Sequence, residues 1–392
     1  MKSKKIGLLI PNLQSGGAER VLSLMSNILS QAGYYVYFIL YDTDDIKYEY
    51  SGKLIDLKTS AGSNVLTKVA IRLIRIIKLS YYKYKYNLDT VISFLYPANV
   101  VNYYSIGRTK KILACRGYGD YIKNGKRYSK MINKIYSFIV QTERMKSEFI
   151  KDLNNDESKV NVLYNPFDIE LIKDKSKEGI EKEIQDFIDT HKTICTVGSF
   201  KRDKGYWHLI KSFIKVKQHI NNAGLIFIGH RGEMEKEIKD LAKASRFNND
   251  ILFLGYQTNP FKYISKCDLY VCSSIYEGFP NSLVEAMACG TAVLSTDCKT
   301  GPREVLCSSY HEEQLKNVKL EAYGVLVPIL SEAIDINIDC IDSEEIIMAE
   351  GIVKVLSNEG LLQKLSKSAK FRADEFSLER YRKSLIEIIE LL

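Results

Sequence analysis

The chain carries KIGLLIPNLQSGGAERVLSLMSNILSQAGYYVYFIL at residues 5–40. The two apolar runs, Lys5–Ile10 and Tyr35–Leu40, predict strands, and the apolar positions between them recur at helical spacing up to Gly33. Strand, glycine turn, helix and strand make a βαβ unit, in which the loop after the first strand lies at the carboxyl edge of a parallel sheet. Because ligands bind at that edge, the stretch predicts an α/β domain with a site beyond its first strand.

Predicted strands and helices continue to alternate along the chain, with one interruption. Three apolar runs are predicted to extend the first sheet: Thr90–Phe94, Lys111–Cys115 and Phe138–Gln141. Regular alternation stops near Asn165, where a charged stretch follows, and resumes from Thr193 to Ser295 as a second series of strands and helices. We therefore expect a first domain at residues 1–170, a second doubly wound domain at 171–375, and a last helix within 376–392 that packs back on the first domain.

Composition narrows the class of protein. With 392 residues, 45% hydrophobic and 27% charged, the chain suits two folded domains, and it has no apolar run of about 18 residues that could cross a bilayer. The first apolar run ends at Pro11 without a small-residue cleavage site, so we expect a first strand rather than a signal peptide, and a cytoplasmic protein. Eight scattered cysteines favour neither disulfides nor a zinc site, and the net charge of +8 favours anionic partners.

The most specific motif is SSIYEGFPNSLVEAMACGTAVLSTD at residues 273–297, in which Glu277 and Glu285 are separated by seven residues. A helix that begins near Asn281 presents unpaired N–H groups and its positive dipole end to a diphosphate, while the Gly-Phe-Pro loop lets the backbone approach. With its flanking Glu-Gly-Phe and Glu-Ala-Met-Ala, the block resembles the Glu-seven-Glu signature of glycosyltransferase family 4.

That resemblance implies the GT-B fold, in which two Rossmann-like domains face each other across a cleft. It also implies that Glu285 accepts hydrogen bonds from the ribose hydroxyls of a nucleotide sugar, and that Glu277 contacts the hydroxyls of the transferred sugar. The remaining donor-binding residues implied by this block are Gly278, Phe279, Pro280, Asn281 and Ser282. The alternative is that Ser282 and Glu285 form only a helix capping box and that Glu277 is a solvated acid.

A second motif, VGSFKRDKGYWHLIKSF at residues 197–213, places several cations in a loop after a predicted strand. It resembles the pyrophosphate clamp of the family, where an Arg just after the strand and a Lys before a Gly neutralise the departing diphosphate. Lys204 matches the lysine. Ser199 stands at the usual place of the arginine, so either Arg202 supplies the second charge or the clamp depends on Lys204 alone.

Two features of the first domain are candidates for the same site. Gly16 and Gly17 occupy the first strand-to-helix turn, where glycines let the backbone approach a phosphate or sugar, and the resemblance places them against donor or acceptor. Arg116 follows the predicted strand KILAC, where related enzymes carry a basic or His residue that reaches the sugar or diphosphate. The pair of glycines does not belong to a G-x-G-x-x-G dinucleotide fingerprint.

Residues 68–86, KVAIRLIRIIKLSYYKYKY, combine apolar positions with Lys68, Arg72, Arg75 and Lys78 near one side of a helical wheel. A basic amphipathic helix with tyrosines beside it predicts binding to an anionic membrane surface. The alternative is an ordinary domain helix with a cationic exposed face. No RNA-binding motif accompanies the tyrosines, so we expect no nucleic-acid partner.

The resemblance as a whole implies a retaining glycosyltransferase that moves a sugar from a nucleotide diphospho-sugar, for which we expect UDP, by front-face attack. The segments ISFLYPANV and CRGYGD resemble the bacterial subgroup that builds capsule and related surface polysaccharides on polyprenyl diphosphate at the inner face of the plasma membrane. We expect no cofactor and no metal, because clamp cations can take over the charge role of a metal. The alternatives are a non-catalytic scaffold for lipid or polysaccharide assembly and another GT-B enzyme, such as a sugar-nucleotide epimerase.

Overall fold

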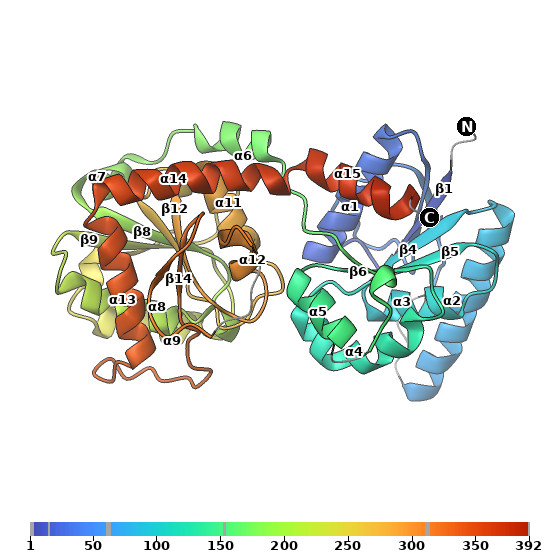
Figure 1. The fold of residues 1–392 in the computed structure, drawn as a ribbon, viewed down its shortest axis with the longest axis horizontal. Helices are drawn as coiled ribbons and strands as arrows, with labels where there is room; N and C mark the ends of the chain where they lie inside the picture. Colours follow the sequence, from blue (N-terminus) through green and yellow to red (C-terminus); the bar gives the residue numbers. More distant parts are fainter. Residues whose placement is uncertain (1–3, 15, 60–63, 152–153, 310–313, 391–392) are drawn as a thin grey trace. The chain divides into compact units, whose positions relative to one another are not determined.

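The computed structural model describes residues 4–14, 16–59, 64–151, 154–309 and 314–390 (Figure 1). The chain divides into two compact units: a first domain that runs to Pro166 and resumes at Glu379, and a second domain, Phe167–Leu378. The boundaries expected from the sequence, after residues 170 and 375, differ by a few residues. The backbone explains the shift, because Phe167 pairs with Ser377 in an isolated parallel bridge inside the second domain.

The first domain is a seven-stranded parallel sheet with the order β3-β2-β1-β4-β5-β6-β7. Its strands are β1 Lys5–Ile10, β2 Tyr35–Leu40, β3 Lys53–Asp56, β4 Thr90–Phe94, β5 Lys110–Ala114, β6 Ser137–Val140 and β7 Val160–Val162. Its helices are α1 Gly17–Gln31, α2 Val65–Lys85, α3 Tyr96–Tyr104, α4 Tyr118–Ile132, α5 Glu143–Lys151 and the last helix, α15 Leu378–Glu390. Nearly all of α15 therefore belongs to the first domain, although it follows the second in the sequence.

The second domain is also a seven-stranded sheet, with the order β10-β9-β8-β11-β12-β14-β13, in which only β13 runs antiparallel to its neighbour. Its strands are β8 Lys192–Val197, β9 Ala223–Ile228, β10 Ile251–Phe253, β11 Leu269–Cys272, β12 Ala292–Thr296, β13 Lys319–Leu320 and β14 Val325–Val327. Its helices are α6 Ile169–Ser176, α7 Lys182–Thr190, α8 Tyr206–Lys217, α9 Glu235–Ala244, α10 Phe261–Ile264, α11 Asn281–Cys289, α12 Pro302–Leu306, α13 Ser343–Leu356 and α14 Glu359–Ala373.

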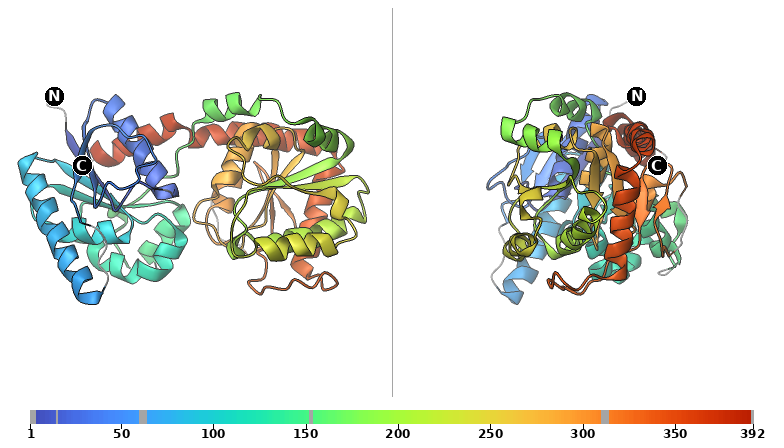
Figure 2. Two further views of the ribbon diagram at one scale, coloured as in Figure 1. Left: turned by 180° about the vertical axis from the view of Figure 1, so that it is seen from behind. Right: turned by 90° about the vertical axis from the view of Figure 1, so that its left-hand side faces the viewer.

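Helices cover both faces of each sheet (Figures 1 and 2), and the central strands are buried along their length. These strands are mostly apolar, with a few buried Ser and Thr residues, because a parallel sheet covered on both sides has no solvent-facing row. The two doubly wound α/β domains predicted from the repeated strand–helix pattern are confirmed.

The chain order of each sheet reverses at one point. In the first sheet the reversal lies between the paired strands β1 and β4, and in the second between β8 and β11. In open parallel sheets, ligands bind beyond the carboxyl ends of the strands at such a switch point. The loops after these four strands are therefore the places in each domain to search for functional side chains.

Helix α2 turns much of its cationic side toward the first domain. Arg75 Nη2 donates to the carbonyl of Thr59 at 2.6 Å, Lys78 Nζ donates to the carbonyl of Leu57 at 2.7 Å, and Lys83 is only 2% exposed. The helix packs on this side because long basic side chains satisfy backbone carbonyls with their charged ends while their stems fill apolar space. Arg75, Lys78 and Lys83 therefore contact the first domain, whereas Lys68, Arg72 and Lys85 are exposed.

The side of α2 that faces away from the domain is apolar. Leu73, Ile77, Tyr81 and Tyr84, which follow one another at helical spacing, are all more than half exposed. Val65 and Leu66, at the start of the helix, are exposed as well. A soluble helix normally buries such a stripe, so this one is a candidate contact surface. Among the helices that the structure covers, none is long and apolar enough to cross a membrane.

Candidate active site

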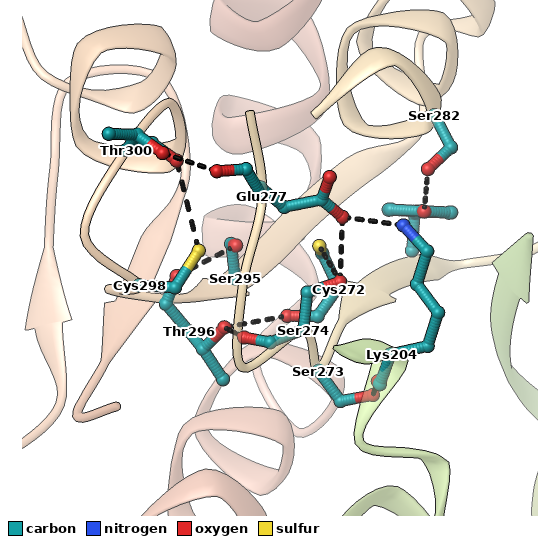
Figure 3. A network of polar contacts seen from close by, with 11 residues as sticks. Lys204, Cys272, Ser273, Ser274, Glu277, Ser282, Ser295, Thr296, Cys298 and Thr300 are labelled. Carbon is teal, nitrogen blue, oxygen red and sulfur yellow. Dashed lines mark hydrogen bonds and ion pairs between the residues drawn. The ribbon is translucent and has the colours of Figure 1, made fainter. Parts of the chain in front are cut away.

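Two loops of the second domain meet beyond the carboxyl ends of β8 and β11 (Figure 3). The loop after β8 carries Lys204, and the loop after β11 carries Glu277. Nζ of Lys204 lies 2.7 Å from Oε1 of Glu277, and both side chains are largely buried. Because the two strands are neighbours at the switch point, residues far apart in the sequence form one ion pair there.

Glu277 is held in place at both its carboxylate and its backbone. Ser274 donates through Oγ to the same Oε1 at 2.7 Å, and Thr300 donates through Oγ1 to the carbonyl of Glu277 (Figure 3). Thr296, at the end of β12, donates in turn to the carbonyl of Ser274. Within the described residues the hydrogen bonds of this carboxylate use Oε1, so Oε2 is left to accept a bond from a ligand hydroxyl.

Lys204 is positioned through its backbone. Ser273 Oγ donates to the carbonyl of Lys204 at 2.9 Å, and Gly205 follows with a left-handed φ of 59°. A Cβ at Gly205 would lie 2.4 Å from the carbonyl oxygen of Ser273, so the turn requires glycine. Burial alone would lower the pKa of the Lys204 ammonium, but the carboxylate of Glu277 raises it, and the net pKa lies above the usual lysine value. Lys204 therefore carries its charge at neutral pH.

The helix that follows Glu277, α11, begins at Asn281, where the sequence pattern predicts it. Its N-cap residue, Pro280, makes no side-chain hydrogen bond to the first turn, and Ser282, inside the helix, accepts a hydrogen bond from the hydroxyl of Tyr270 at 2.7 Å. Pro280 therefore holds the N-cap position that a capping box would assign to Ser282. The start of a helix supplies backbone N–H groups and a partial positive charge, which suit a phosphate. Glu285 lies about one turn inside the helix and is half-buried.

The other loop residues have separate surroundings. Phe279 is buried against Phe167 and Phe376, with ring centroids 6.3 and 5.6 Å away, so its side chain is part of the core. Arg202 is exposed, and its Nη2 donates to the carbonyl of Glu332 at 2.7 Å. Its guanidinium is therefore held by the segment before α13 rather than by the Lys204–Glu277 pair.

Ser199 and Gly278 lie in the two loops that carry the ion pair. Ser199 follows β8 and is half-buried, and its carbonyl accepts from the backbone N–H of Lys201 at 2.8 Å. Gly278 is likewise half-buried, directly after Glu277. Pro280 stands at the N-cap position of α11, where its backbone carbonyl accepts from the N–H of Leu283 at 3.0 Å.

Arg116 follows β5 in the first domain, at the carboxyl edge of that sheet. Its guanidinium lies over the ring of Phe94, 4.8 Å from the centroid, and Nη2 donates to Oδ1 of Asn165. In the part of the chain that the structure describes, Nε and Nη1 are buried without a hydrogen-bond partner. Burial lowers the pKa of Arg116, while Tyr381 and then Cys115 oppose that shift. A buried guanidinium with open donors is suited to an anion or a hydroxyl-rich ligand.

Gly16 and Gly17 lie where the βαβ pattern predicts, at the start of α1 beyond β1. Gly16 is the N-cap of the helix with a φ of 151°, and a Cβ there would lie 2.3 Å from a carboxylate oxygen of Glu19. Gly17 is exposed, with open space where its Cβ would be. Next to this turn, beyond β4, Leu95 adopts a φ of 72°. Such a conformation is uncommon for a non-glycine residue and is found at functional sites.

A buried cluster behind the Lys204 loop joins α8 to α13. Nδ1 of His208 lies 2.5 Å from Oε1 of Glu345, and Nζ of Lys211 lies 3.0 Å from the same oxygen. His208 Nε2 donates to the carbonyl of Ser331 at 3.0 Å, and the N–H of Asp342 donates to Oε2 of Glu345 at 2.8 Å. His208, Asp342 and Glu345 are spaced as metal ligands could be. Since both ring nitrogens of His208 and both carboxylate oxygens of Glu345 are already used by these contacts, the cluster fits a structural ion network.

Several residues of these networks escaped the sequence analysis. Ser274 could have been suspected, because a polar residue directly after a buried strand lies at the ligand edge of the sheet. No sequence pattern indicates Thr300, because it lies in a separate loop and donates to the backbone carbonyl of Glu277. The His208–Glu345 contact joins two helices that lie far apart in the sequence, so local sequence patterns do not predict it.

Residues 177–319 match a family model described as glycosyl transferases group 1. An uncharacterized glycosyltransferase of Methanocaldococcus jannaschii is 31% identical over 275 residues, which is 67% of each chain. A Campylobacter jejuni protein named N-acetylgalactosamine-N,N'-diacetylbacillosaminyl-diphospho-undecaprenol 4-alpha-N-acetylgalactosaminyltransferase is 27% identical over 392 residues, 95% of this chain and 96% of that one.

Among solved structures, Anabaena HepE in complex with UDP superposes with a TM-score of 0.72 at 16% identity, over 99% of this chain and 100% of that one. A glycosyltransferase from Rickettsia africae superposes with a TM-score of 0.74 at 16% identity over the whole of both chains. At these identities, the likeness shows the fold.

Proposed function

Because the chain belongs to the group 1 glycosyltransferases, we propose that it transfers a sugar from a nucleotide diphospho-sugar to a saccharide carried on polyprenyl diphosphate. The observation that carries this proposal is the ion pair between Lys204, in the loop after β8, and Glu277, in the loop that leads into α11. The Campylobacter jejuni relative, whose name specifies a diphospho-undecaprenol acceptor, supports the lipid carrier. The UDP complex of the structural neighbour HepE supports UDP as the nucleotide.

In this proposal the second domain binds the donor. The backbone N–H groups at the start of α11 and the ammonium of Lys204 contact the diphosphate, and Oε2 of Glu277 accepts from a hydroxyl of the transferred sugar. Glu285 accepts from the ribose hydroxyls. Arg116 of the first domain, with its open buried donors, contacts the sugar or the diphosphate.

The reaction breaks the bond between the anomeric carbon and the donor phosphate oxygen, and it forms a bond from the acceptor hydroxyl oxygen to the same carbon. Positive charge develops on the sugar while negative charge develops on the diphosphate. Lys204 and the helix amides stabilise the diphosphate charge, which lowers the barrier without a metal ion. Attack on the face that the diphosphate leaves lets its oxygen take the proton of the acceptor hydroxyl, and the anomeric configuration is retained.

The direct test is to incubate the protein with UDP-sugars and a short polyprenyl-diphosphate-linked saccharide, and to measure UDP release and product linkage by NMR. We expect release that requires the acceptor, retention of configuration, and no change on addition of EDTA. Nucleotide sugar that remains unconsumed with every acceptor would indicate a non-catalytic scaffold. Conversion of the donor into its epimer would indicate a sugar-nucleotide epimerase.

We also propose that the protein acts at the inner face of the plasma membrane and binds an anionic membrane surface through α2. The exposed apolar stripe that includes Leu73, Ile77, Tyr81 and Tyr84 supports this, because such side chains enter the boundary between headgroups and acyl chains. The exposed cations Lys68 and Arg72 lie on the same helix and suit anionic headgroups.

Replacing Leu73 and Ile77 by serine is expected to weaken vesicle binding by at least about tenfold, because two side chains lose their apolar contact with the bilayer. Binding is measured by co-sedimentation with liposomes. The matched control replaces Leu171 and Ile346 by serine, since both are exposed on helices of the second domain. Equal binding of both double variants and the wild type would contradict docking through α2.

A further inference from the structure

The first domain has a cavity at the amino edge of its sheet, opposite the edge that carries Gly16 and Arg116. It has a volume of about 790 Å³, within the usual range of ligand pockets, and lies between α2, the turn before β5 and α15. Lys4, Thr90 and Lys110 line it, and they lie at the starts of β1, β4 and β5. Because these strands are parallel, their starts share the amino edge, whereas Gly16 and Arg116 lie beyond the carboxyl ends.

The charge of this cavity is predominantly positive. Its lining includes Lys4, Lys83, Arg108 and Lys110 but only one carboxylate, Asp89. Asp89 already accepts a hydrogen bond from the backbone N–H of residue 5 at 2.8 Å. Within the described chain, Lys4, Lys83 and Arg108 form no ion pair with an acidic side chain. Several cations around one cavity with so little compensating charge favour an anionic ligand.

Lys83 is the buried member of this group. Nζ donates to Oδ1 of Asn102 at 2.9 Å and to Oγ of Ser105 at 2.6 Å. An ammonium has three donors, so one remains after these two bonds. Burial, together with the neighbouring Lys111, lowers the pKa of Lys83 to about 7. A bound anion would offset the cost of burying this charge, which no carboxylate in the described chain does.

The rim of the cavity is apolar and continuous with the exposed stripe of α2. Tyr84 and Ile106 both line the cavity, and they are 84% and 79% exposed. Tyr84 is also the last member of the stripe that begins with Leu73 and Ile77. A ligand with an anionic head and an apolar tail would match this combination of a cationic interior and an apolar rim.

We propose that this cavity binds the phosphoryl headgroup of an anionic membrane phospholipid, while the acyl region of the same bilayer contacts the exposed stripe of α2. The proposal rests on the membrane docking argued above and adds a headgroup site to it. It is distinct from the donor and acceptor sites, because its residues lie at the opposite edge of the sheet from Arg116 and Gly16.

The test compares binding of the full-length protein to vesicles of phosphatidylcholine alone and to vesicles that contain about one-third phosphatidylglycerol. We expect Lys4→Glu combined with Arg108→Glu to weaken binding to phosphatidylglycerol vesicles by about tenfold or more, with no change on phosphatidylcholine. The matched control is Lys236→Glu combined with Lys354→Glu, which reverses two exposed charges of the second domain. Lys83→Met removes the buried donor without altering exposed charge and should weaken binding in the same direction. Thermal unfolding of each variant verifies its fold.

Three other results would contradict the proposal, and each would point to a different explanation. If both charge-reversed variants lose binding equally, the attraction is unspecific and the cavity is not a headgroup site. If wild-type binding does not depend on phosphatidylglycerol, the headgroup site is absent, although docking through α2 can still stand. If glycerol 3-phosphate in solution binds and Lys83→Met abolishes that binding without any effect on vesicles, the ligand is a free phosphate compound. Sugar transfer is tested separately, by measuring UDP release in the absence of vesicles. Loss of vesicle binding and loss of catalytic activity can therefore be distinguished.

Discussion

Replacing Lys204 by alanine is expected to lower kcat for sugar transfer by about 100- to 1,000-fold, which is the usual cost of removing one preorganised electrostatic group from an active site. The diphosphate gains negative charge as the glycosidic bond breaks, and Lys204 is the cation held nearest to Glu277, 2.7 Å away. The sequence has Ser199 where the family resemblance predicts an arginine, and the guanidinium of Arg202 donates to the carbonyl of Glu332, so we expect neither to compensate. The measurement is the rate of UDP release with acceptor at saturating donor.

Lys201→Ala is the matched control, because this lysine is exposed in the same loop, three residues before Lys204. We expect it to reduce the rate by less than about threefold, since a solvated charge stabilises little. A double variant, Lys204→Ala with Glu277→Gln, should cost clearly less than the product of the single effects, because the two side chains act as a unit. Full additivity, or a Lys204→Ala variant within tenfold of wild type, would show that this lysine is not the diphosphate cation.

Replacing Glu345 by alanine is expected to lower the free energy of unfolding of the second domain by about 3–5 kcal/mol, the range for breaking a buried ion pair. Glu345 and Lys211 are both fully buried, and the carboxylate is also bonded to His208. Removing it leaves the buried ammonium of Lys211 with longer contacts to Asp335, whose carboxylate is partly exposed and lies 3.7 Å away and whose carbonyl accepts at 3.4 Å. The fluorescence of Trp207 reports this unfolding, because it is the only tryptophan of the chain and is buried on α8.

The control variant is Glu350→Ala, an exposed position on the same helix, which should change the free energy of unfolding by less than about 0.5 kcal/mol. A second variant, Glu345→Leu with Lys211→Met, removes both charges and fills the space with apolar atoms. It should be more stable than Glu345→Ala, because no buried charge is then left unpaired. If the two variants unfold alike, the loss arises from packing rather than from an uncompensated charge.

Local sequence patterns were sufficient for most of the fold. The apolar runs at β1 and β8, the glycine turns after them and the helical spacing of α8 and α11 are each contained within about 20 residues. They therefore predict both doubly wound sheets. Short edge strands such as β3 and β13 were not predicted, because four or fewer residues carry too little periodicity to separate strand from loop.

Sequence motifs predicted which residues belong to the candidate site but not the contacts between them. The spacing of Glu277 and Glu285 and the position of Lys204 could be read from the sequence, whereas the contact between Lys204 and Glu277 depends on which strands are neighbours. The orientation of α2 could not be predicted, since a helical wheel shows two faces without showing which one packs. Its basic side chains satisfy the carbonyls of Leu57 and Thr59, and that outcome depends on how the segment after β3 folds back along the helix, which a helical wheel does not show.

The backbone of Phe167 bonds on both sides to the segment that leads into α15: its N–H donates to the carbonyl of Phe376, and its carbonyl accepts from the N–H of Leu378. Hydrogen bonds thus join the first and last segments of the second domain. The second domain is one continuous stretch of sequence, inserted between the two stretches that form the first domain. During synthesis on the ribosome, the inserted domain has its entire sequence before the outer one does. The outer domain must wait for α15, so a nascent product, or one truncated before α15, is expected to expose apolar surface that this helix covers.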